Sequence, residues 1–323
     1  MKAAIPGMPK MGRARTIEAA VAIVLLAVLA LAPTFVARIT ALFFVLNWIV
    51  LAESFNMFAG LTGYVNFGHV VFYGVGGYAG ALLMANAHAS PYLAVVVGGL
   101  ASSLLALGIS LPTTRLRGAY FAIATLSINE AFFVTFDNWD AVGSAPGFTL
   151  PISYYQPVQE YYAMLVLAVL CIAAMLLISR SKFGIALQAI KQQESTASSI
   201  GINPAYYKTM TLVFSGFFAG VAGALAIWQI TFIDPPSAFN ITITVNSISM
   251  AMLGGLGTVA GPIIGGALLY ELTDYLGLSY PFIHLIVLGV IIIGVVLVIP
   301  DGIVGAARRL YARVRRKERA ASG

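Results

Sequence analysis

Two carboxylates stand inside long apolar stretches of this sequence, where a charge is expensive. Glu53 and Glu130 lie in segments long enough to cross a bilayer, and neither has a lysine or arginine near it in the same segment. An unpaired charge at that depth costs several kcal/mol, so both side chains are expected to face protein or water, and a neutral hydrogen-bonded form is one solution. Glu130 follows Ser127 and Asn129, and this polar group could bind a polar ligand or merely bridge helices.

The stretch FNMFAGLTGYVNFGHVVFYGVGGYAGALL, residues 55–83, combines many glycines with polar side chains. One interpretation is close helix packing, of which the GxxxG at 76–80 is typical. The other is a broken segment that lines a pathway, because irregular backbone survives at membrane depth only inside protein or beside a water-filled cavity. Thr62, Asn66 and His69 favour the second interpretation, although a lone histidine in a membrane is more often a packed hydrogen-bonding residue.

A similar glycine-rich stretch, MAMLGGLGTVAGPIIGGALLYEL, occupies residues 250–272. Its fragments resemble those at 55–83 but are short, which makes them a weak sign of internal duplication. The candidate pathway residues from both stretches and from the polar positions near them are Glu53, Gly60, Thr62, Gly63, Asn66, His69, Asn129, Glu130, Asn246, Gly254 and Gly255.

The sequence lacks the residue spacings that are typical of enzyme active sites and metal sites. His69, His88 and His284 are scattered, Cys171 is the only cysteine, and there is no HExxH motif, nucleophile elbow or GxxxxGK[ST] phosphate loop. We therefore expect no catalytic residue, no metal and no cofactor bound by this chain.

The composition indicates the membrane that would hold these residues. Of 323 residues, 60% are hydrophobic and 9% are charged, against roughly 25% charged in an ordinary soluble domain. The mean hydropathy is +0.92. In a bilayer, helices satisfy their own backbone hydrogen bonds and lipid accepts their apolar side chains. The sequence therefore predicts an all-α polytopic membrane protein.

About ten spanning helices are expected, within a range of 8 to 11, when about 20 apolar residues are taken as one crossing. The first apolar run begins at Ile17 and exceeds the usual length of a cleaved signal peptide, so we expect it to be retained. The predicted helices are 17–37, 40–59, 64–85, 91–111, 118–136, 160–179, 206–232, 241–256, 260–275 and 282–300.

Charge predicts the orientation of these helices. With ten helices and a cytoplasmic N-terminus, only Arg38 of the 18 lysines and arginines falls outside, which leaves 17 inside and fits the positive-inside rule. Both termini are then cytoplasmic, with a tail at 1–16, a transmembrane domain at 17–300 and a basic tail at 301–323. That tail is an orientation signal beside anionic lipid, so no nucleic-acid partner is expected.

Two polar loops interrupt the apolar body. Residues 137–160 could cap a pathway, meet an external protein or only connect helices. Residues 180–208 show the apolar spacing of short amphipathic helices, with Gly201 as a helix stop and a turn at Asn203-Pro204. On physical grounds alone, this second loop could equally lie on the membrane surface or dock to a soluble protein.

Four blocks of sequence, in order, resemble one family. They are GLTGYVNFGHVVFYGVGGY, LRGAYFAIATLSINE, SKFGIALQAIKQQESTASSIGIN with YYKTMTLVFSGFFAGVAGAL, and MAMLGGLGTVAGPIIGGAL. Residues from about 40 to 300 resemble the inner-membrane permeases of ABC importers for branched-chain amino acids, in particular the longer, LivM-like of the two subunit types.

The resemblance implies a role for the loop at 180–208 and a set of partners. It places Phe183, Gly184, Ala186, Glu194 and Gly201 in a cytoplasmic coupling loop that binds an ATPase subunit. It implies a multi-pass protein of the bacterial inner membrane, a second and usually different permease subunit, two ATPases that use ATP, and a periplasmic substrate-binding protein. Transport would proceed by alternating access, in contact with membrane lipid.

Departures from the family pattern fall on candidate pathway positions. Asn66 stands where serine is frequent, Asn129 where glycine is common and Asn246 where we look for a glutamate, while GSAPG at 143–147 replaces a TGG-like loop. Branched-chain amino acids lead as cargo, but relatives carry urea, short amides and aromatic or other carboxylates. A self-contained secondary transporter or channel is the alternative from another class, and it gives no reason for the coupling block.

Overall fold

The protein is a bundle of long helices with two short helices at one end. The computed structural model describes residues 27–35, 38–279, 289–290, 302–307 and 309. The long helices are α2 (Ile39–Thr62), α3 (His69–Ala87), α4 (Pro91–Thr113), α5 (Ala119–Asp137), α6 (Pro157–Arg180), α9 (Pro204–Ile230) and α12 (Ala260–Ser279); the shorter helices are α7 (Lys182–Gln192), α8 (Glu194–Ser199), α10 (Pro235–Ala238) and α11 (Ile241–Gly254).

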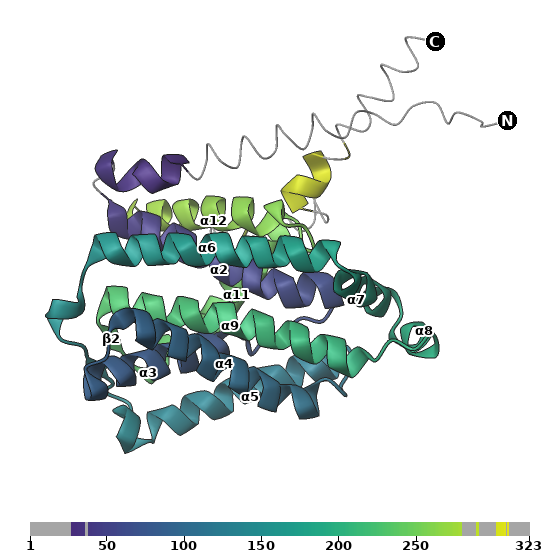
Figure 1. Ribbon diagram of the computed structural model, residues 1–323, viewed down its shortest axis with the longest axis horizontal. Coiled ribbons are helices and arrows are strands. Elements are labelled where there is room, and N and C mark those ends of the chain that lie inside the picture. The colour runs from purple at the N-terminus through teal and green to yellow at the C-terminus, as the bar shows by residue number, and fades with distance from the viewer. Residues whose placement is uncertain (1–26, 36–37, 280–288, 291–301, 308, 310–323) are drawn as a thin grey trace, which may run out of the picture.

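The two ends of the bundle differ in structure. At one end, which we call the α7–α8 end, α6 passes into the two short helices (Figure 1). At the other, which we call the β end, strand β1 (Phe148–Thr149) pairs antiparallel with β2 (Phe232–Ile233). Short 3-10 turns at Asp140–Val142 and Ile152–Tyr154 complete the connection from α5 to α6.

Helix α9 forms the centre of the bundle and packs against α2, α3, α4 and α6. Small residues make this packing close: a Cβ placed on Gly76 would lie 2.3 Å from the Gly220 carbonyl oxygen, and one on Gly80 would lie 2.9 Å from Ala224 Cβ. The close-packing interpretation of the GxxxG at 76–80 is therefore confirmed, because side chains at these positions would separate the helices.

Six helices of the described residues are long and apolar enough to cross a membrane, namely α2, α3, α4, α5, α6 and α9. The ten-span prediction is not confirmed. The helix predicted at 241–256 is present as α11, but its 14 residues reach only about 21 Å, less than the roughly 30 Å hydrocarbon core. The predicted helix 282–300 apart from 289–290 and most of 17–37 lie outside the described residues, as do both predicted tails apart from 302–307 and 309.

The loop predicted at 137–160 packs onto the β end. Trp228 Nε1 donates to the Tyr154 carbonyl at 2.6 Å, and the Tyr154 hydroxyl donates to the Met84 carbonyl at 3.2 Å. Nearby, the ring centroids of Phe136 and Phe239 lie 4.9 Å apart, and the Tyr78 ring packs against both. This aromatic cluster fills the space between α3, α5 and the turn after α10.

The short helices predicted within 183–200 are present as α7 and α8. The Ser181 hydroxyl caps α7 by accepting a hydrogen bond from the Gly184 amide at 3.3 Å, and Gly201 ends the pair with a φ of +87°. The Asn203 side chain then caps α9 by accepting from the Tyr206 amide at 3.3 Å. Serine and asparagine caps and a left-handed glycine are the usual signals for such boundaries.

Candidate functional site

The helical structure is interrupted between α2 and α3, and the chain turns back into the bundle there. Gly63 ends α2 with a φ of +80°, and residues 63–68, which we call the α2–α3 joint, are not helical. The Nε2 atom of His69, the first residue of α3, lies 3.1 Å from the Ser54 hydroxyl. Since Ser54 lies about 12 Å along α2 from its end, the joint re-enters the bundle. The helix predicted from residue 64 therefore begins at 69, and the predicted broken segment is confirmed.

This joint walls a cavity of about 630 Å³ near the α7–α8 end, which we call the joint cavity. The opposite walls are the first turn of α5 and one face of α11. The lining residues are Gly63, Tyr64, Val65, Phe67, Gly118, Ala119, Ala122, Ile248 and Met252. Of the predicted pathway residues, only Gly63 lines this space directly.

A second broken segment lies against the first. Residues 255–259, which we call the α11–α12 joint, connect the two helices through Gly255 at a φ of +127°. The Asn56 side chain binds this joint twice, accepting from the Gly257 amide at 2.6 Å and donating to the Thr258 carbonyl at 3.0 Å. Gly60 permits the contact, because a Cβ there would lie 2.8 Å from the Gly257 nitrogen.

Glu53 is fully buried one turn before Asn56. One of its carboxylate oxygens lies 3.5 Å from the Asn56 amide nitrogen, and the other has no hydrogen-bond partner among the described residues. Glu53 therefore faces protein, as predicted. Because Asn56 contacts both Glu53 and the α11–α12 joint, it belongs to the same polar group, and the sequence analysis missed it.

The polar group predicted at 127–130 is divided between two faces of α5, so that prediction is wrong. Asn129 is buried and donates to the Phe239 carbonyl at 3.2 Å, whereas Ser127 and Glu130 are exposed on the helix surface. Adjacent helical residues point about 100° apart, which is why residues close in sequence separate here.

The other predicted pathway residues shape the joints. Thr62 donates to the Phe58 carbonyl at 2.7 Å, and Asn66 accepts from the Gly68 amide at 2.9 Å. Gly254 meets α12 so closely that a Cβ would lie 1.7 Å from the Gly261 carbonyl oxygen. Asn246 is half-buried on α11. The structure thus brings most of these residues to the joints, where they fix the backbone around the cavity.

The loop at 180–208, predicted to be the coupling loop, forms an ion pair next to the α2–α3 joint. Glu194, the first residue of α8, accepts a hydrogen bond from Lys208 Nζ at 3.0 Å, and the side chain of Lys208 is only 1% exposed. The Tyr64 hydroxyl also donates to Glu194, and the lysine ammonium lies 4.5 Å from the centre of the Tyr64 ring. Burial raises the pKa of the Glu194 carboxyl, but the hydrogen bonds from Tyr64 and Lys208 and the positive charges of Lys208 and Arg117 together outweigh it, so the pKa lies below its usual value.

Lys191 binds the same region from α7. Its ammonium donates to the Gly60 carbonyl at 2.8 Å and lies 3.5 Å from the position of a Cβ on Gly257. Partial burial lowers the pKa of this ammonium. Sequence reasoning treated Lys191 and Lys208 only as orientation signals. Lys208 could have been found from its position, because a lysine within the first turns of an apolar helix needs a partner.

The remaining coupling residues hold α7 and α8 in place. Phe183 packs its ring 4.9 Å from that of Tyr207, and Ala186 is buried against the bundle. At Gly184 a Cβ would lie 2.3 Å from the Ile178 carbonyl oxygen, so the turn from α6 into α7 has no room for a side chain. Gly201, in contrast, is exposed, with open space around its Cα.

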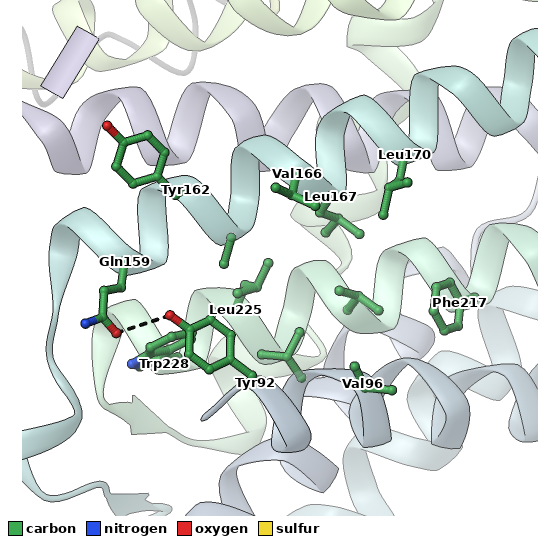
Figure 2. Close-up of a pocket in the computed structure, with 13 residues that line it drawn as sticks. Tyr92, Val96, Gln159, Tyr162, Val166, Leu167, Leu170, Phe217, Leu225 and Trp228 are labelled. Carbon is green, nitrogen blue, oxygen red and sulfur yellow. Dashed lines mark hydrogen bonds between the residues drawn. The ribbon is translucent and has the colours of Figure 1, made fainter. Parts of the chain in front are cut away.

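A second cavity of about 490 Å³ lies between α4, α6 and α9 and is a poor site for a charged substrate. Its walls are aliphatic and aromatic side chains such as Val166, Leu170 and Phe217, and its polar groups gather at one end, where the Tyr92 hydroxyl donates to Gln159 at 3.2 Å (Figure 2). The exposed side chains flanking it on α4 and α6 are also apolar, which is typical of a lipid-facing groove.

Comparison with known proteins identifies the family. The high-affinity branched-chain amino acid transport system permease protein LivM of Salmonella typhimurium is 27% identical over 253 residues, which cover 69% of this chain and 59% of LivM. LivM of Escherichia coli is 26% identical over the same shares of the two chains. The chain thus spans 59% of the length of these relatives. The LivH permease of Salmonella typhimurium is 26% identical over 291 residues, 80% of this chain and 91% of LivH. No solved structure matches the chain.

The match extends through both joints and the coupling loop. Residues 37–296 fit the family described as branched-chain amino acid transport system / permease component. Because this range covers most of the chain, including every predicted pathway and coupling residue, the protein belongs to the branched-chain amino acid transport permease family.

Proposed function

We propose that this chain is the permease subunit of an ATP-binding-cassette importer that carries branched-chain or related amino acids across the bacterial inner membrane. The observation that carries the proposal is that the α7–α8 pair binds the last turn of α2 through Lys191 and the wall of the joint cavity through Glu194. A helix pair that both faces solvent and holds a broken membrane segment can relay the movement of a soluble motor. The relatives named LivM and LivH are transport permeases, which supports the same role.

The packing of α7 favours protein docking over adsorption to the membrane. Its apolar residues Ala186, Leu187 and Ile190 are buried against the bundle, so lipid is not needed to cover them. Ile185 and Ile200 remain on the outer surface of the loop at 65% and 70% exposure. Exposed aliphatic side chains at a polar end of a membrane protein suit a protein partner, and a separate ATPase is the partner we infer.

Charge supports a cytoplasmic α7–α8 end. Arg38 begins α2 at the β end and pairs with Asp274 at 3.0 Å. Five basic residues that follow α4, end α6 or belong to α7 lie at the α7–α8 end; they are Arg115, Arg117, Arg180, Lys182 and Lys191. Because cytoplasmic loops carry excess lysine and arginine, the β end would face the periplasm, where the substrate-binding protein would deliver its cargo.

The surface of α5 supports a second permease subunit. Tyr120, Ile123 and Leu126 are exposed there, and the same helix exposes Ser127 and Glu130. A carboxylate facing lipid is costly, so a protein surface is expected to cover this face. The joint cavity opens beside the start of α5, and a partner at this face would complete the pathway for which α5 and α11 supply one wall.

The two ends of the bundle suit alternating access. At the β end the Tyr78, Phe136 and Phe239 rings pack together, while the joint cavity lies towards the α7–α8 end. Binding-protein contacts at one end and ATPase contacts at the other would select between this arrangement and one open to the periplasm.

Reconstitution of the complete importer tests the proposal. We expect leucine uptake into proteoliposomes that requires the second permease, the ATPases, ATP and the binding protein together. Titration of the binding protein with leucine, urea and aromatic acids assigns the cargo. Uptake by this chain alone, driven by an ion gradient without ATP, would contradict the proposal and identify a secondary transporter.

Charge substitution tests the docking surface separately. The Ile185→Glu and Ile200→Glu pair should weaken binding of the ATPase by tenfold or more, which is about 1.4 kcal/mol, and leave the folded chain intact. Ile152→Glu makes the same change at a 77% exposed site on the β end and serves as the matched control. Equal ATPase binding by both variants would exclude this surface.

A further inference from the structure

Tyr64 belongs at once to the cavity wall and to the coupling loop. It lines the joint cavity one residue after the end of α2, and its hydroxyl donates to Glu194 at the start of α8. Its ring also packs at 5.5 Å, edge to face, against Phe121 on α5. Among the residues that line the joint cavity, Tyr64 makes the one side-chain hydrogen bond to α7 or α8 that the described residues show.

Rigid anchors surround this contact. Lys208 at the start of α9 fixes Glu194 at 3.0 Å, and burial of that lysine makes the pair hard to separate. Lys191 fixes the end of α2 through the Gly60 carbonyl at 2.8 Å. The α7–α8 pair therefore binds the last turn of α2 at Gly60 and the start of the α2–α3 joint at Tyr64, four residues apart.

Two glycines near Tyr64 allow the backbone around the joint cavity to change its conformation. Gly63 has a φ of +80°, and Gly118, across the cavity, has a φ of +53° with no atom within 4 Å of an added Cβ. Glycine permits large changes in φ and ψ at low cost, whereas the helices on either side are rigid. Movement of α7–α8 would therefore be absorbed in the joint and would change the position of Tyr64 in the cavity wall.

We propose that Tyr64 is the positioning residue that links the coupling helices to the joint cavity: its bond to Glu194 makes the α2–α3 joint follow α7–α8, and so sets the width of the inner end of the pathway. This inference rests on the proposed function and adds the residue that transmits the movement. Lys191 holds the α2 end of the same joint and supports this transmission.

Tyr64→Phe in the complete reconstituted importer tests the link, because it removes one hydroxyl and keeps the ring. ATP hydrolysis should persist, while the amount of substrate carried per ATP falls about fivefold or more, the lower end of the range for coupling between sites. Tyr275→Phe makes the same change at a 65% exposed position on α12 and should leave the ratio unchanged. An unchanged ratio in Tyr64→Phe, or an equal loss of hydrolysis and transport, would overturn the inference.

Two further measurements keep the result clear. Lys191→Met removes the second contact from a partly exposed side chain and should lower the same ratio; if Tyr64→Phe fails to assemble, an unchanged ratio in Lys191→Met overturns the inference. Spin labels at Val65 and Met252, in a Cys171→Ala background, should report a distance change on ATP addition that Tyr64→Phe abolishes. If the wild-type importer shows no ATP-dependent uptake, the proposed function is contradicted. If the wild-type importer transports and the variants carry as much substrate per ATP as it does, the function stands and only the role of Tyr64 is contradicted.

Discussion

The side-chain oxygen of Asn56 accepts a hydrogen bond from the Gly257 amide at 2.6 Å, across 201 residues of sequence. This contact places two broken helices side by side: the end of α2 and the joint between α11 and α12. The similar glycine-rich stretches that contain them are thus neighbours in the fold. Their glycines allow the backbones to meet, and one amide side chain then satisfies the polar groups that the breaks expose.

Asn56→Leu should destabilise the chain strongly. The change leaves the partly buried Gly257 amide and Thr258 carbonyl without the partners they have at 2.6 and 3.0 Å, and each group left unsatisfied costs up to about 1–3 kcal/mol. Thermal unfolding in detergent measures the loss. Asn138→Leu, at an exposed site where the amide donates to Val134, is the matched control, and a similar drop in both variants would contradict the role assigned to Asn56.

Three glycine-to-alanine variants should separate crowding from backbone strain. Gly254→Ala places a Cβ 1.7 Å from the Gly261 carbonyl oxygen and should cost about 3 kcal/mol or more by overpacking. Gly201→Ala has open space but a φ of +87°, which costs about 1–2 kcal/mol in a residue with a side chain.

Gly108→Ala completes this series as its control. No atom lies within 4 Å of the added methyl group in α4, so helix propensity should make the change neutral or stabilising by about 0.5–1 kcal/mol. The thermal unfolding temperature should be highest for Gly108→Ala, lower for Gly201→Ala and lowest for Gly254→Ala. If Gly254→Ala unfolded at a higher temperature than Gly201→Ala, the contacts around Gly254 would have relaxed at little cost.

Lys208→Met should lower the free energy of unfolding far more than loss of a surface ion pair does. Lys208 is 1% exposed where it meets Glu194, and removing one partner of a buried pair costs about 3 kcal/mol or more. The Arg38 to Asp274 pair has the same 3.0 Å separation, but Arg38 is 65% exposed, so Arg38→Ala should cost at most about 1 kcal/mol. Comparable losses in unfolding experiments would mean that water reaches Lys208. A double-mutant cycle with Glu194→Gln gives the coupling between the two residues.

Much of the helical framework could be predicted, because runs of apolar residues ended by glycine, proline or a capping side chain mark membrane helices. Gly201 and Asn203 are examples: Gly201 ends the short helices and Asn203 caps the start of α9, where the pattern places a helix stop and a turn. The helix predicted at 241–256 is present as α11, but Asn240 caps its start and the break at Gly255 ends it after 14 residues, which are too few to cross a bilayer.

The contacts that join the coupling loop to the joints could not be predicted. Lys191 and Gly60 lie 131 residues apart, and no local pattern specifies which carbonyl a flexible lysine will reach. Glu53 could be assigned to the interior from the cost of its charge, whereas Glu130 could not, because a partner outside the chain can offset the same cost. Periodicity determines which residues share a helix face, but the packing of distant helices determines what that face meets.

A fall in pH should lower the stability of the folded protein, partly because Glu194 becomes protonated. Its pKa is lowered in the folded protein, so the unfolded chain binds the proton more readily; the stabilisation is therefore complete above the ordinary value of 4.5 and is lost as the pH falls through the folded pKa. The unfolding temperatures of wild type and Glu194→Gln should differ clearly at pH 7 and converge at a pH well below 4.5, because protonation makes the carboxyl resemble the neutral amide. An equal difference at both pH values would show that the glutamine disturbs packing instead of removing the charge that Lys208 and Tyr64 stabilise.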